Sequence, residues 1–281
     1  MKKGLFFIHF ILLVCLVGGQ TTIKDGQEVH GKWTKSGSPY IVEGEAIVPY
    51  GKTLTIGNEV EVQFKTGTDS DYLRSNGRKN KSFDLGYLRV LGTVVAKGKK
   101  NKAIVFTGTE KNGKWGNIVL YKSNGNVFEY CEFHNCQYMR DIVPDDNSTG
   151  ALSFIESEGL VKNCVITNSW SGVNAKKGGT PKIINCTIIE NEYGIESNSD
   201  SEIFVENTIV WNNANAFYIN AGAKIKITYS LTQDKSVTEG LQPVEGMIFG
   251  TDPLLTSKYK LSDGSPCIKA GSKKANIGAN F

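Results

Sequence analysis

The chain has 281 residues, of which 40% are hydrophobic and 21% are charged, so it has enough apolar material for a packed core and is not a disordered chain. Its 32 Lys and Arg against 28 Asp and Glu give a formal net charge of +4, which falls to +2 without Lys2 and Lys3. That charge is too small to indicate a nucleic-acid-binding protein, and we expect no nucleic-acid partner.

The first residues have the features of a secretory signal peptide. Two lysines precede an apolar run from Leu5 to Val17, and two glycines then lead into polar residues. The run is shorter than the roughly 20 apolar residues that a membrane helix needs, and no later segment is long and apolar enough. We therefore predict a signal peptide over residues 1–19, a domain over residues 20–281 without a membrane span, and a secreted, periplasmic or cell-surface location.

A repeat of about 22 residues organises the middle of the chain. The segments 163–173 and 185–195 match position for position, and a third copy includes Asn207. The interval from Cys164 to Cys186 is 22 residues and that from Cys186 to Asn207 is 21. Self-similarity at this period predicts a solenoid, in which each coil buries its apolar face only by stacking on its neighbours.

The repeats indicate strands, because their apolar residues are β-branched, come in short runs and are flanked by turn residues. The predicted strands cover residues 54–64, 87–96, 103–107, 117–120, 127–133, 151–155, 160–167, 173–175, 182–189, 195–197, 203–210, 216–220 and 224–231.

On these repeats the chain resembles the right-handed parallel β-helix family, the pectate-lyase-like superfold, and in particular its secreted bacterial members. Residues 44–64 look like the first coils of such proteins, and residues 252–278 resemble their closing segment. The resemblance covers the chain from about Ser38 onward. It implies an all-β fold, a single-stranded right-handed parallel β-helix (β-solenoid) with coils of about 22 residues and irregular N- and C-terminal caps.

Three cysteines, Cys131, Cys164 and Cys186, fall in the same register, and Asn207 is predicted to take the next place. Equivalent positions in neighbouring coils lie roughly 4.8 Å apart and point the same way. We therefore predict a column of buried reduced thiols without disulfides. A zinc site is not expected, since His134 is the only histidine near a cysteine.

A second column is predicted at a turn, where Ser169, Asn191 and Asn212 align. Asparagine tolerates left-handed backbone angles and can form hydrogen bonds along such a column. We interpret this column as structural.

One coil is longer than the others. The interval from Cys131 to Cys164 is 33 residues, and the additional residues fall between Asn135 and Gly150. Excursions from a rigid scaffold often carry binding residues. Aromatic rings near carboxylates suit a sugar, because a flat ring covers C–H bonds while the acids accept hydrogen bonds from hydroxyls. The predicted substrate-binding residues in this excursion and in the same turn of the next coils are Tyr138, Trp170, Glu192, Tyr193 and Trp211.

The family contains many polysaccharide lyases, glycoside hydrolases and uronate epimerases, so the resemblance implies a carbohydrate ligand. A lyase needs a base and a group that neutralises the uronate carboxylate, often Ca²⁺ on acidic residues. Candidates for a Ca²⁺ site are Asp141, Asp145 and Asp146, and candidate catalytic residues are Arg140, Asp145, Asp146 and Lys176. The alternative is that residues 144–147 form a solvated turn and that Lys176 lies outside a strand end.

The sequence lacks a polygalacturonase-like set of catalytic residues, and a two-carboxylate hydrolase would have only Asp145 or Asp146 with Glu190 or Glu192. We therefore predict a secreted or periplasmic protein that binds an acidic polysaccharide or cell-surface glycan and, if it is an enzyme, cleaves it by lyase-like β-elimination. The alternative is a non-catalytic carbohydrate-binding, adhesive or structural surface β-solenoid. Residues 66–86 are predicted to form a loop that either covers the helix or caps its end.

Overall fold

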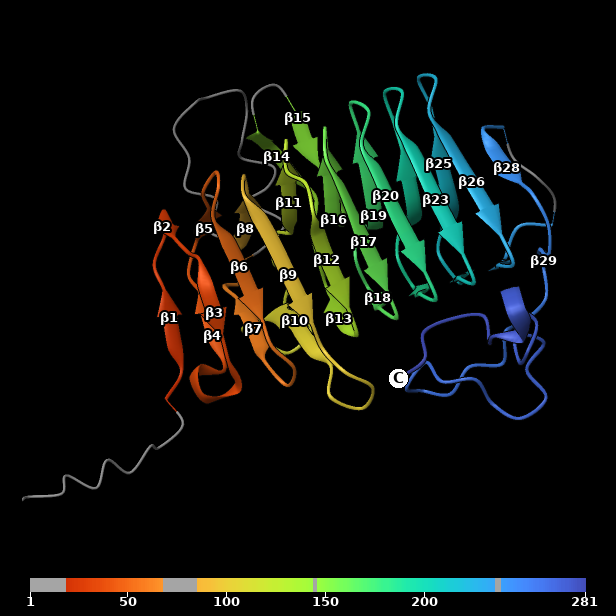
Figure 1. Ribbon diagram of the computed structural model, residues 1–281, viewed down its shortest axis with the longest axis horizontal. Coiled ribbons are helices and arrows are strands. Elements are labelled where there is room, and N and C mark those ends of the chain that lie inside the picture. Colours follow the sequence, from red (N-terminus) through yellow and green to blue (C-terminus); the bar gives the residue numbers. More distant parts are fainter. Residues whose placement is uncertain (1–18, 68–84, 144–145, 236–238) are drawn as a thin grey trace, which may run out of the picture.

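The computed structural model describes residues 19–67, 85–143, 146–235 and 239–281. In this part of the chain, three parallel sheets wind into a β-helix, and each strand pairs with its counterparts in the coils before and after it (Figure 1). No α-helix occurs among these residues; two short 3-10 turns cover Lys35–Gly37 and Ser272–Lys274. The predicted β-helix is confirmed.

From β1 to β26, each coil contributes one strand to each sheet in turn. Sheet 1 consists of β1 (Thr21–Ile23), β4 (Tyr40–Val42), β7 (Glu61–Phe64), β10 (Ile104–Gly108), β13 (Cys131–His134), β18 (Val165–Thr167), β21 (Thr187–Ile189), β24 (Ile209–Trp211), β27 (Leu231–Thr232) and β29 (Ile248–Phe249). Sheet 2 consists of β2 (Gln27–Glu28), β5 (Glu45–Val48), β8 (Tyr87–Val90), β11 (Ile118–Tyr121), β16 (Gly150–Ile155), β19 (Ser171–Lys176), β22 (Tyr193–Ser197) and β25 (Asn215–Ile219). Sheet 3 consists of β3 (Gly31–Trp33), β6 (Thr53–Ile56), β9 (Thr93–Lys97), β12 (Asn126–Glu129), β17 (Glu158–Lys162), β20 (Thr180–Ile184), β23 (Glu202–Glu206), β26 (Lys224–Thr228) and β28 (Leu241–Pro243).

The core is a stack of inward-pointing side chains inside the coils. Strands such as β5 and β7 alternate half-buried and buried residues, as a strand with one face on a core should. Phe106 and Phe133 in successive coils stack with their ring centroids 4.8 Å apart. Cys131, Cys164 and Cys186 are buried and free of disulfides, which confirms the predicted column of thiols.

Several predicted strands are wrong at the corner between sheets 3 and 1, where the chain turns from one sheet to the other. The predicted strands 160–167, 182–189 and 203–210 were each wrong as single strands, because an asparagine in the left-handed region divides each of them into a sheet 3 strand and a sheet 1 strand. These residues, Asn163, Asn185 and Asn207, have φ of 50°, 52° and 50°. Asparagine adopts this conformation more easily than most residues do, so one residue suffices to turn the chain.

The prediction that Asn207 takes the next place in the cysteine column was also wrong. Asn207 follows Asn185 at the corner, and Thr208 is the residue that comes after Cys186 in the column. The amide of Cys186 donates to Thr208 Oγ1 at 3.2 Å. The spacing from Asn185 to Asn207 is therefore 22 residues, so the period stays constant.

The turn ladder contains Ser169, Asn191 and Asn213, and the prediction that Asn212 joins it was wrong. The amide of Ser169 donates to Asn191 Oδ1 at 2.9 Å, and the amide of Asn191 donates to Asn213 Oδ1 at 3.0 Å. Asn212 instead takes the left-handed corner position, with a φ of 52°, and its side chain is exposed. The side chain of the residue after the corner, Asn213, points inward, and this position forms the ladder.

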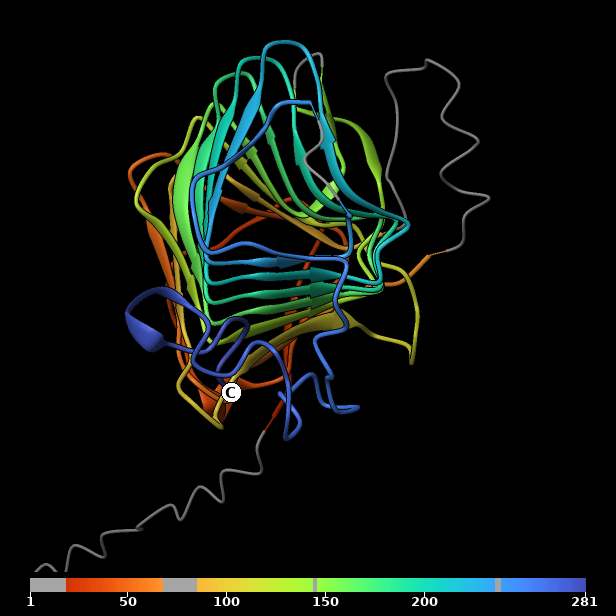
Figure 2. The same ribbon diagram turned by 90° about the vertical axis from the view of Figure 1, so that its right-hand side faces the viewer.

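Both ends of the β-helix differ from a simple cap. The sheets begin at β1, before the Ser38 expected from the resemblance, because β1, β2 and β3 pair with the second coil. After β29, residues 250–281 turn back along the outer face of sheet 1 (Figure 2). We call these residues the C-terminal segment.

The C-terminal segment is held on sheet 1 by hydrogen bonds and apolar contacts. The amide of Gly278 donates to the carbonyl of Asn207 at 2.7 Å, and the amide of Ala279 donates to Thr187 Oγ1 at 3.0 Å. An apolar cluster lies between the segment and sheet 1, with half-buried neighbours such as Trp211. Its buried residues are Ile209 and Leu231 of sheet 1 and Cys267 and Ile277 of the segment.

The predicted excursion in the longer coil is an antiparallel hairpin of β14 (Met139–Val143) and β15 (Asp146–Ser148). Met139 packs with Leu85, Val119 and Ile155, so the hairpin lies against the outer face of sheet 2. The predicted loop over residues 66–86 lies mostly outside the described residues.

Candidate functional site

Four aromatic residues form a row along the corner between sheets 1 and 2. Tyr138, Trp170, Tyr193 and Tyr218 come from four successive coils, and their ring centroids are 5.7, 6.4 and 5.6 Å apart in that order. Trp170 is 38% exposed and Tyr218 is 43% exposed. We call these four residues the aromatic row.

The backbone ladder between coils positions the middle of this row. The amide of Trp170 donates to the carbonyl of Cys136, and the amide of Tyr193 donates to the carbonyl of Trp170, both at 2.9 Å. Neighbouring rings meet at angles of 45° to 67°, so they do not form one plane, and only Tyr193 and Tyr218 pack edge against face. A ligand therefore has access to the most exposed rings, those of Trp170 and Tyr218.

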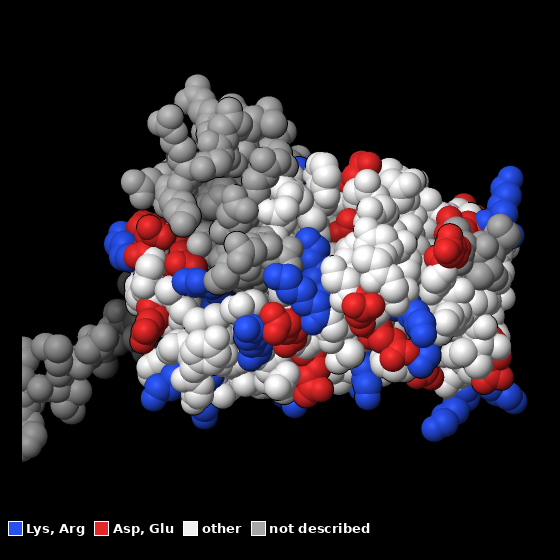
Figure 3. Space-filling model, turned by 90° about the horizontal axis from the view of Figure 1, so that it is seen from above, with Lys and Arg blue, Asp and Glu red and all other residues white. Residues whose placement is uncertain are grey.

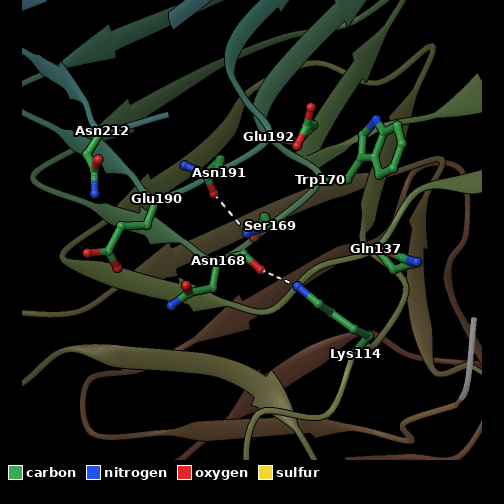
Figure 4. Close-up of a pocket in the computed structure, with 9 residues that line it drawn as sticks. All are labelled: Lys114, Gln137, Asn168, Ser169, Trp170, Glu190, Asn191, Glu192 and Asn212. Atoms are coloured by element: carbon green, nitrogen blue, oxygen red, sulfur yellow. Dashed lines mark hydrogen bonds between the residues drawn. The ribbon is translucent and has the colours of Figure 1, made fainter. Parts of the chain in front are cut away.

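A groove of about 430 Å³ lies beside the row (Figure 4). It is lined by Lys114, Gln137, Asn168, Ser169, Trp170, Glu190, Asn191, Glu192 and Asn212. We call this cavity the corner groove. Its lining has four amides, two carboxylates, one hydroxyl, one ammonium and one indole ring. These groups can donate hydrogen bonds to hydroxyl groups and accept hydrogen bonds from them.

Two charged residues of the corner groove have defined partners. The ammonium of Lys114 donates to the carbonyl of Asn168 at 2.6 Å. The carboxylate of Glu190 accepts from the hydroxyl of Tyr259 at 3.2 Å and from Thr167 Oγ1 at 3.4 Å. Glu190 is thus held by the C-terminal segment, which is distant from it in sequence.

A buried carboxyl group lies on sheet 2, on the same strand as Tyr193. Glu196 is 5% exposed, and its carboxylate accepts from Thr149 Oγ1 and, at 3.2 Å, from Asn174 Nδ2. Burial raises the pKa of Glu196, and the hydrogen bond from Thr149 and the charge of Lys176 oppose that rise. Glu196 pairs in register with Tyr218 of the aromatic row.

The structure brings together some of the predicted site residues. Tyr138, Trp170 and Tyr193 belong to the aromatic row, and Glu192 lines the corner groove. Trp211 does not join the row; it ends β24 and packs beside the apolar cluster under the C-terminal segment.

The predicted catalytic and metal-binding residues are described less fully. Arg140 and Asp141 lie on β14 and Asp146 on β15, where only the backbone is described, and Asp145 lies outside the described residues. The ammonium of Lys176 donates to the carbonyl of Asn147 at 3.0 Å. Within the described ranges, no three or more His, Cys, Asp or Glu residues come together as a metal site. The catalytic roles and the Ca²⁺ site stay predictions.

Sequence reasoning missed Tyr218, Glu196, Lys114 and Gln137. Tyr218 falls three residues after Asn215, the register partner of Tyr193, so the repeat alignment did not place it in the row. Lys114 and Gln137 lie outside the strands of the repeat. A signal for Glu196 was available in the sequence. Glu196 points outward on β22, and its register partner in the next coil is an aromatic residue, Tyr218.

The surface seen from above carries acidic and basic side chains side by side (Figure 3). Neither sign dominates the part of that view formed by described residues. In the described part of the chain, no helix is long and apolar enough to cross a membrane.

The sequence model of a family described as "Right handed beta helix region" matches residues 94–246, which is more than half of the chain. The match covers the coils that carry the aromatic row, Glu196 and Trp211. The protein therefore belongs to the right-handed β-helix family, as the three parallel sheets also indicate. No curated protein matches the sequence.

Proposed function

We propose that the protein binds a polysaccharide along the aromatic row and the corner groove. The observation that carries the proposal is the row itself: four rings in successive coils, of which Trp170 and Tyr218 are 38% and 43% exposed. Solvent-exposed aromatic rings beside a polar cavity are typical of surfaces that bind ligands. A sugar ring offers C–H groups to such rings and hydroxyls to the polar side chains.

The corner groove supplies the polar half of that interaction. Glu192 is exposed at the groove, and Asn168 and Asn212 present amide groups to it. Because the groove follows the stacking direction of the coils, a chain of sugars could contact equivalent positions in successive coils. This regular arrangement favours a polymer over a single small molecule.

Cleavage of the bound chain is a second candidate function, and Glu196 is the observation that favours it. A buried carboxyl group with a raised pKa can exchange a proton nearer to neutral pH than an exposed one. Lyase-like cleavage would also require the predicted residues Arg140, Asp145, Asp146 and Lys176, with or without Ca²⁺.

The predicted signal peptide supports a function outside the cytoplasm, which is part of this proposal. Residues 1–18 lie outside the described residues, so secretion is part of the proposal. A secreted, periplasmic or surface-bound protein would meet polysaccharides directly.

Affinity electrophoresis in gels containing soluble polysaccharides tests binding. Barley β-glucan, xyloglucan, galactomannan, pectate and alginate form the panel, and retardation by at least one of them is the expected result. Trp170→Ala should abolish most of the retardation. Tyr50→Ala is the matched control, since Tyr50 is 61% exposed but lies on the corner between sheets 2 and 3. Equal retardation of both variants would contradict the proposal.

A separate assay tests cleavage. Ultraviolet absorbance of the unsaturated uronate is followed over pectate and alginate, with and without Ca²⁺, and reducing ends are measured over the neutral polysaccharides. Product formation that Glu196→Gln removes would support the second candidate. Retardation without any product would indicate that the protein binds the polysaccharide but does not cleave it.

A further inference from the structure

A second cavity adjoins the corner groove on the side of the C-terminal segment. It has a volume of about 430 Å³ and is lined by Ile189, Glu190, Trp211, Asn212, Asp252, Pro253, Leu255, Thr256, Ser257 and Tyr259. We call it the tail recess. Glu190 and Asn212 line both cavities, so these two residues form a shared boundary.

A short hairpin of the C-terminal segment forms the outer wall of the tail recess. Leu255 and Leu261 form an antiparallel bridge, and both pack with the apolar cluster under the segment. Near the tip of the hairpin, the amide of Tyr259 donates to the carbonyl of Thr256 at 2.8 Å. The hydroxyl of Tyr259 then reaches Glu190 at 3.2 Å. The wall is therefore anchored at its base by apolar packing and at its tip by a hydrogen bond to the boundary residue.

The tail recess repeats the chemistry of the corner groove. The half-buried ring of Trp211 lies there with a carboxylate, Asp252, and with the hydroxyls of Thr256 and Ser257. An aromatic ring with acceptors and hydroxyls around it fits another sugar unit. The two cavities together thus offer two indole rings, Trp170 and Trp211, on either side of Glu190.

The charges of the two cavities select against an acidic ligand. Glu190, Glu192 and Asp252 line them, whereas Lys114 is the one cation among their lining residues and donates to a backbone carbonyl. Lys258, next to Tyr259, lines a different cavity farther along sheet 1. Carboxylates facing carboxylates lower affinity, whereas uncharged hydroxyl groups can donate to all three acids.

We propose that the corner groove and the tail recess form one extended site for a neutral, hydroxyl-rich polysaccharide, whose chain crosses Glu190 and contacts both Trp170 and Trp211. This inference rests on the proposed function and assigns its ligand class and a second subsite. The C-terminal segment then completes the binding site in addition to covering sheet 1.

The test compares variants of the two cavities on ligands of two lengths. A neutral polysaccharide that retards the protein, from barley β-glucan, xyloglucan and galactomannan, is partially hydrolysed and separated into disaccharides and long oligosaccharides. Affinities are measured by titration calorimetry. Trp211→Leu keeps an apolar side chain beside the apolar cluster under the C-terminal segment but removes the flat ring. Tyr259→Phe removes only the hydroxyl that donates to Glu190.

We expect Trp211→Leu to weaken binding of the long oligosaccharides about tenfold and to leave disaccharide binding at the Trp170 side unchanged. Tyr259→Phe should weaken binding of the long oligosaccharides by a smaller factor. Adding Glu190→Gln to Tyr259→Phe should lower this affinity little further. Thermal unfolding of both variants shows whether the C-terminal segment is still in place, because its loss would lower the melting temperature.

Two results would overturn the inference while leaving the proposed function intact. The first is retardation by pectate or alginate but by none of the neutral polysaccharides. The second is full affinity of Trp211→Leu and Tyr259→Phe for long oligosaccharides while Trp170→Ala loses binding. A protein that none of the five polysaccharides retards would contradict the proposed function as well.

Discussion

The coils point apolar side chains outward at two places. The chain covers these side chains at one place and leaves them exposed at the other. On the outer face of sheet 1, Ile209 and Leu231 are both 0% exposed under the C-terminal segment. At the neighbouring corner, Trp170 and Tyr218 are 38% and 43% exposed. Apolar surface that the chain covers itself stabilises the fold, whereas apolar surface left open beside a polar groove is available to a ligand.

Sheet 1 shows the same contrast along its own length. One outward column runs through Glu61, Val105 and Glu132 in the early coils, all half-buried. It continues through Val165, Thr187 and Ile209, which are buried. The column changes from mostly polar to mostly apolar where the C-terminal segment begins to cover it. The segment and the face beneath it are therefore matched in composition.

The largest effect is expected for truncation of a side chain under the C-terminal segment. Leu231→Ala should lower the free energy of unfolding by about 2–5 kcal/mol, because it leaves a cavity in a fully buried cluster. Urea denaturation measures the change. A loss below about 0.5 kcal/mol would mean that the segment does not stay packed on sheet 1 in solution.

An exposed ring of the aromatic row should show the opposite behaviour. Trp170→Ala should weaken polysaccharide binding by about 1 kcal/mol or more and change the free energy of unfolding by at most about 0.5 kcal/mol. Affinity electrophoresis and urea denaturation of the same sample give both numbers. Strong destabilisation with unchanged binding would place Trp170 with the structural apolar residues.

A smaller effect concerns the buried acid next to the row. Because burial raises the pKa of Glu196 above its ordinary value of 4.5, the folded protein binds more protons than the unfolded chain between pH 4.5 and the folded pKa. The contribution of Glu196 to stability is therefore complete below pH 4.5 and is lost as the pH rises through the folded pKa. The Glu196→Gln variant should lack this fall.

Urea denaturation across this pH range measures the difference between the two proteins, since contributions of other groups cancel. Glu192→Gln is the matched control, because Glu192 is exposed and directly precedes β22, the strand that carries Glu196. An identical pH dependence for wild type and Glu196→Gln would show that the carboxyl group is not desolvated.

The smallest effect is expected where sheet 1 is only partly covered, at Val105, which lines an open cavity beside the C-terminal segment. Val105 occupies the same outward column as Leu231 but is only half-buried. Val105→Ala should cost about 0.5–1 kcal/mol, because it removes only partly buried methyl groups and leaves no closed cavity. A loss as large as that of Leu231→Ala would remove the contrast between the two ends of the sheet.

Sequence reasoning recovered most of the β-helix but not its corners. The repeat identified the coils, the cysteine column and the place of the β14–β15 hairpin. It joined strands across Asn185 and Asn207, because a single left-handed residue inside a β-branched run leaves no break in the hydropathy pattern. It also chose Asn212 for the ladder, since neighbouring asparagines cannot be distinguished until the corner is known.

The candidate site was recovered in part for a related reason. Tyr138, Trp170 and Tyr193 could be predicted because they follow equivalent strands of successive coils. Tyr218 escaped notice because it enters the row from a position three residues farther along its strand. Glu196 could be seen as an acidic residue, but its hydrogen bond from Thr149 joins residues 47 apart in the sequence.

The sequence by itself determined the period of the coils, the alternation of inward and outward residues, and the turn residues that permit each corner. These properties are local, because each depends on residues within one coil and its nearest copy. The tertiary structure alone decided which outward faces are covered and which cavities adjoin. Tyr259 meets Glu190 across 69 residues, and no periodic pattern encodes a contact made by an irregular segment folding back on the coils.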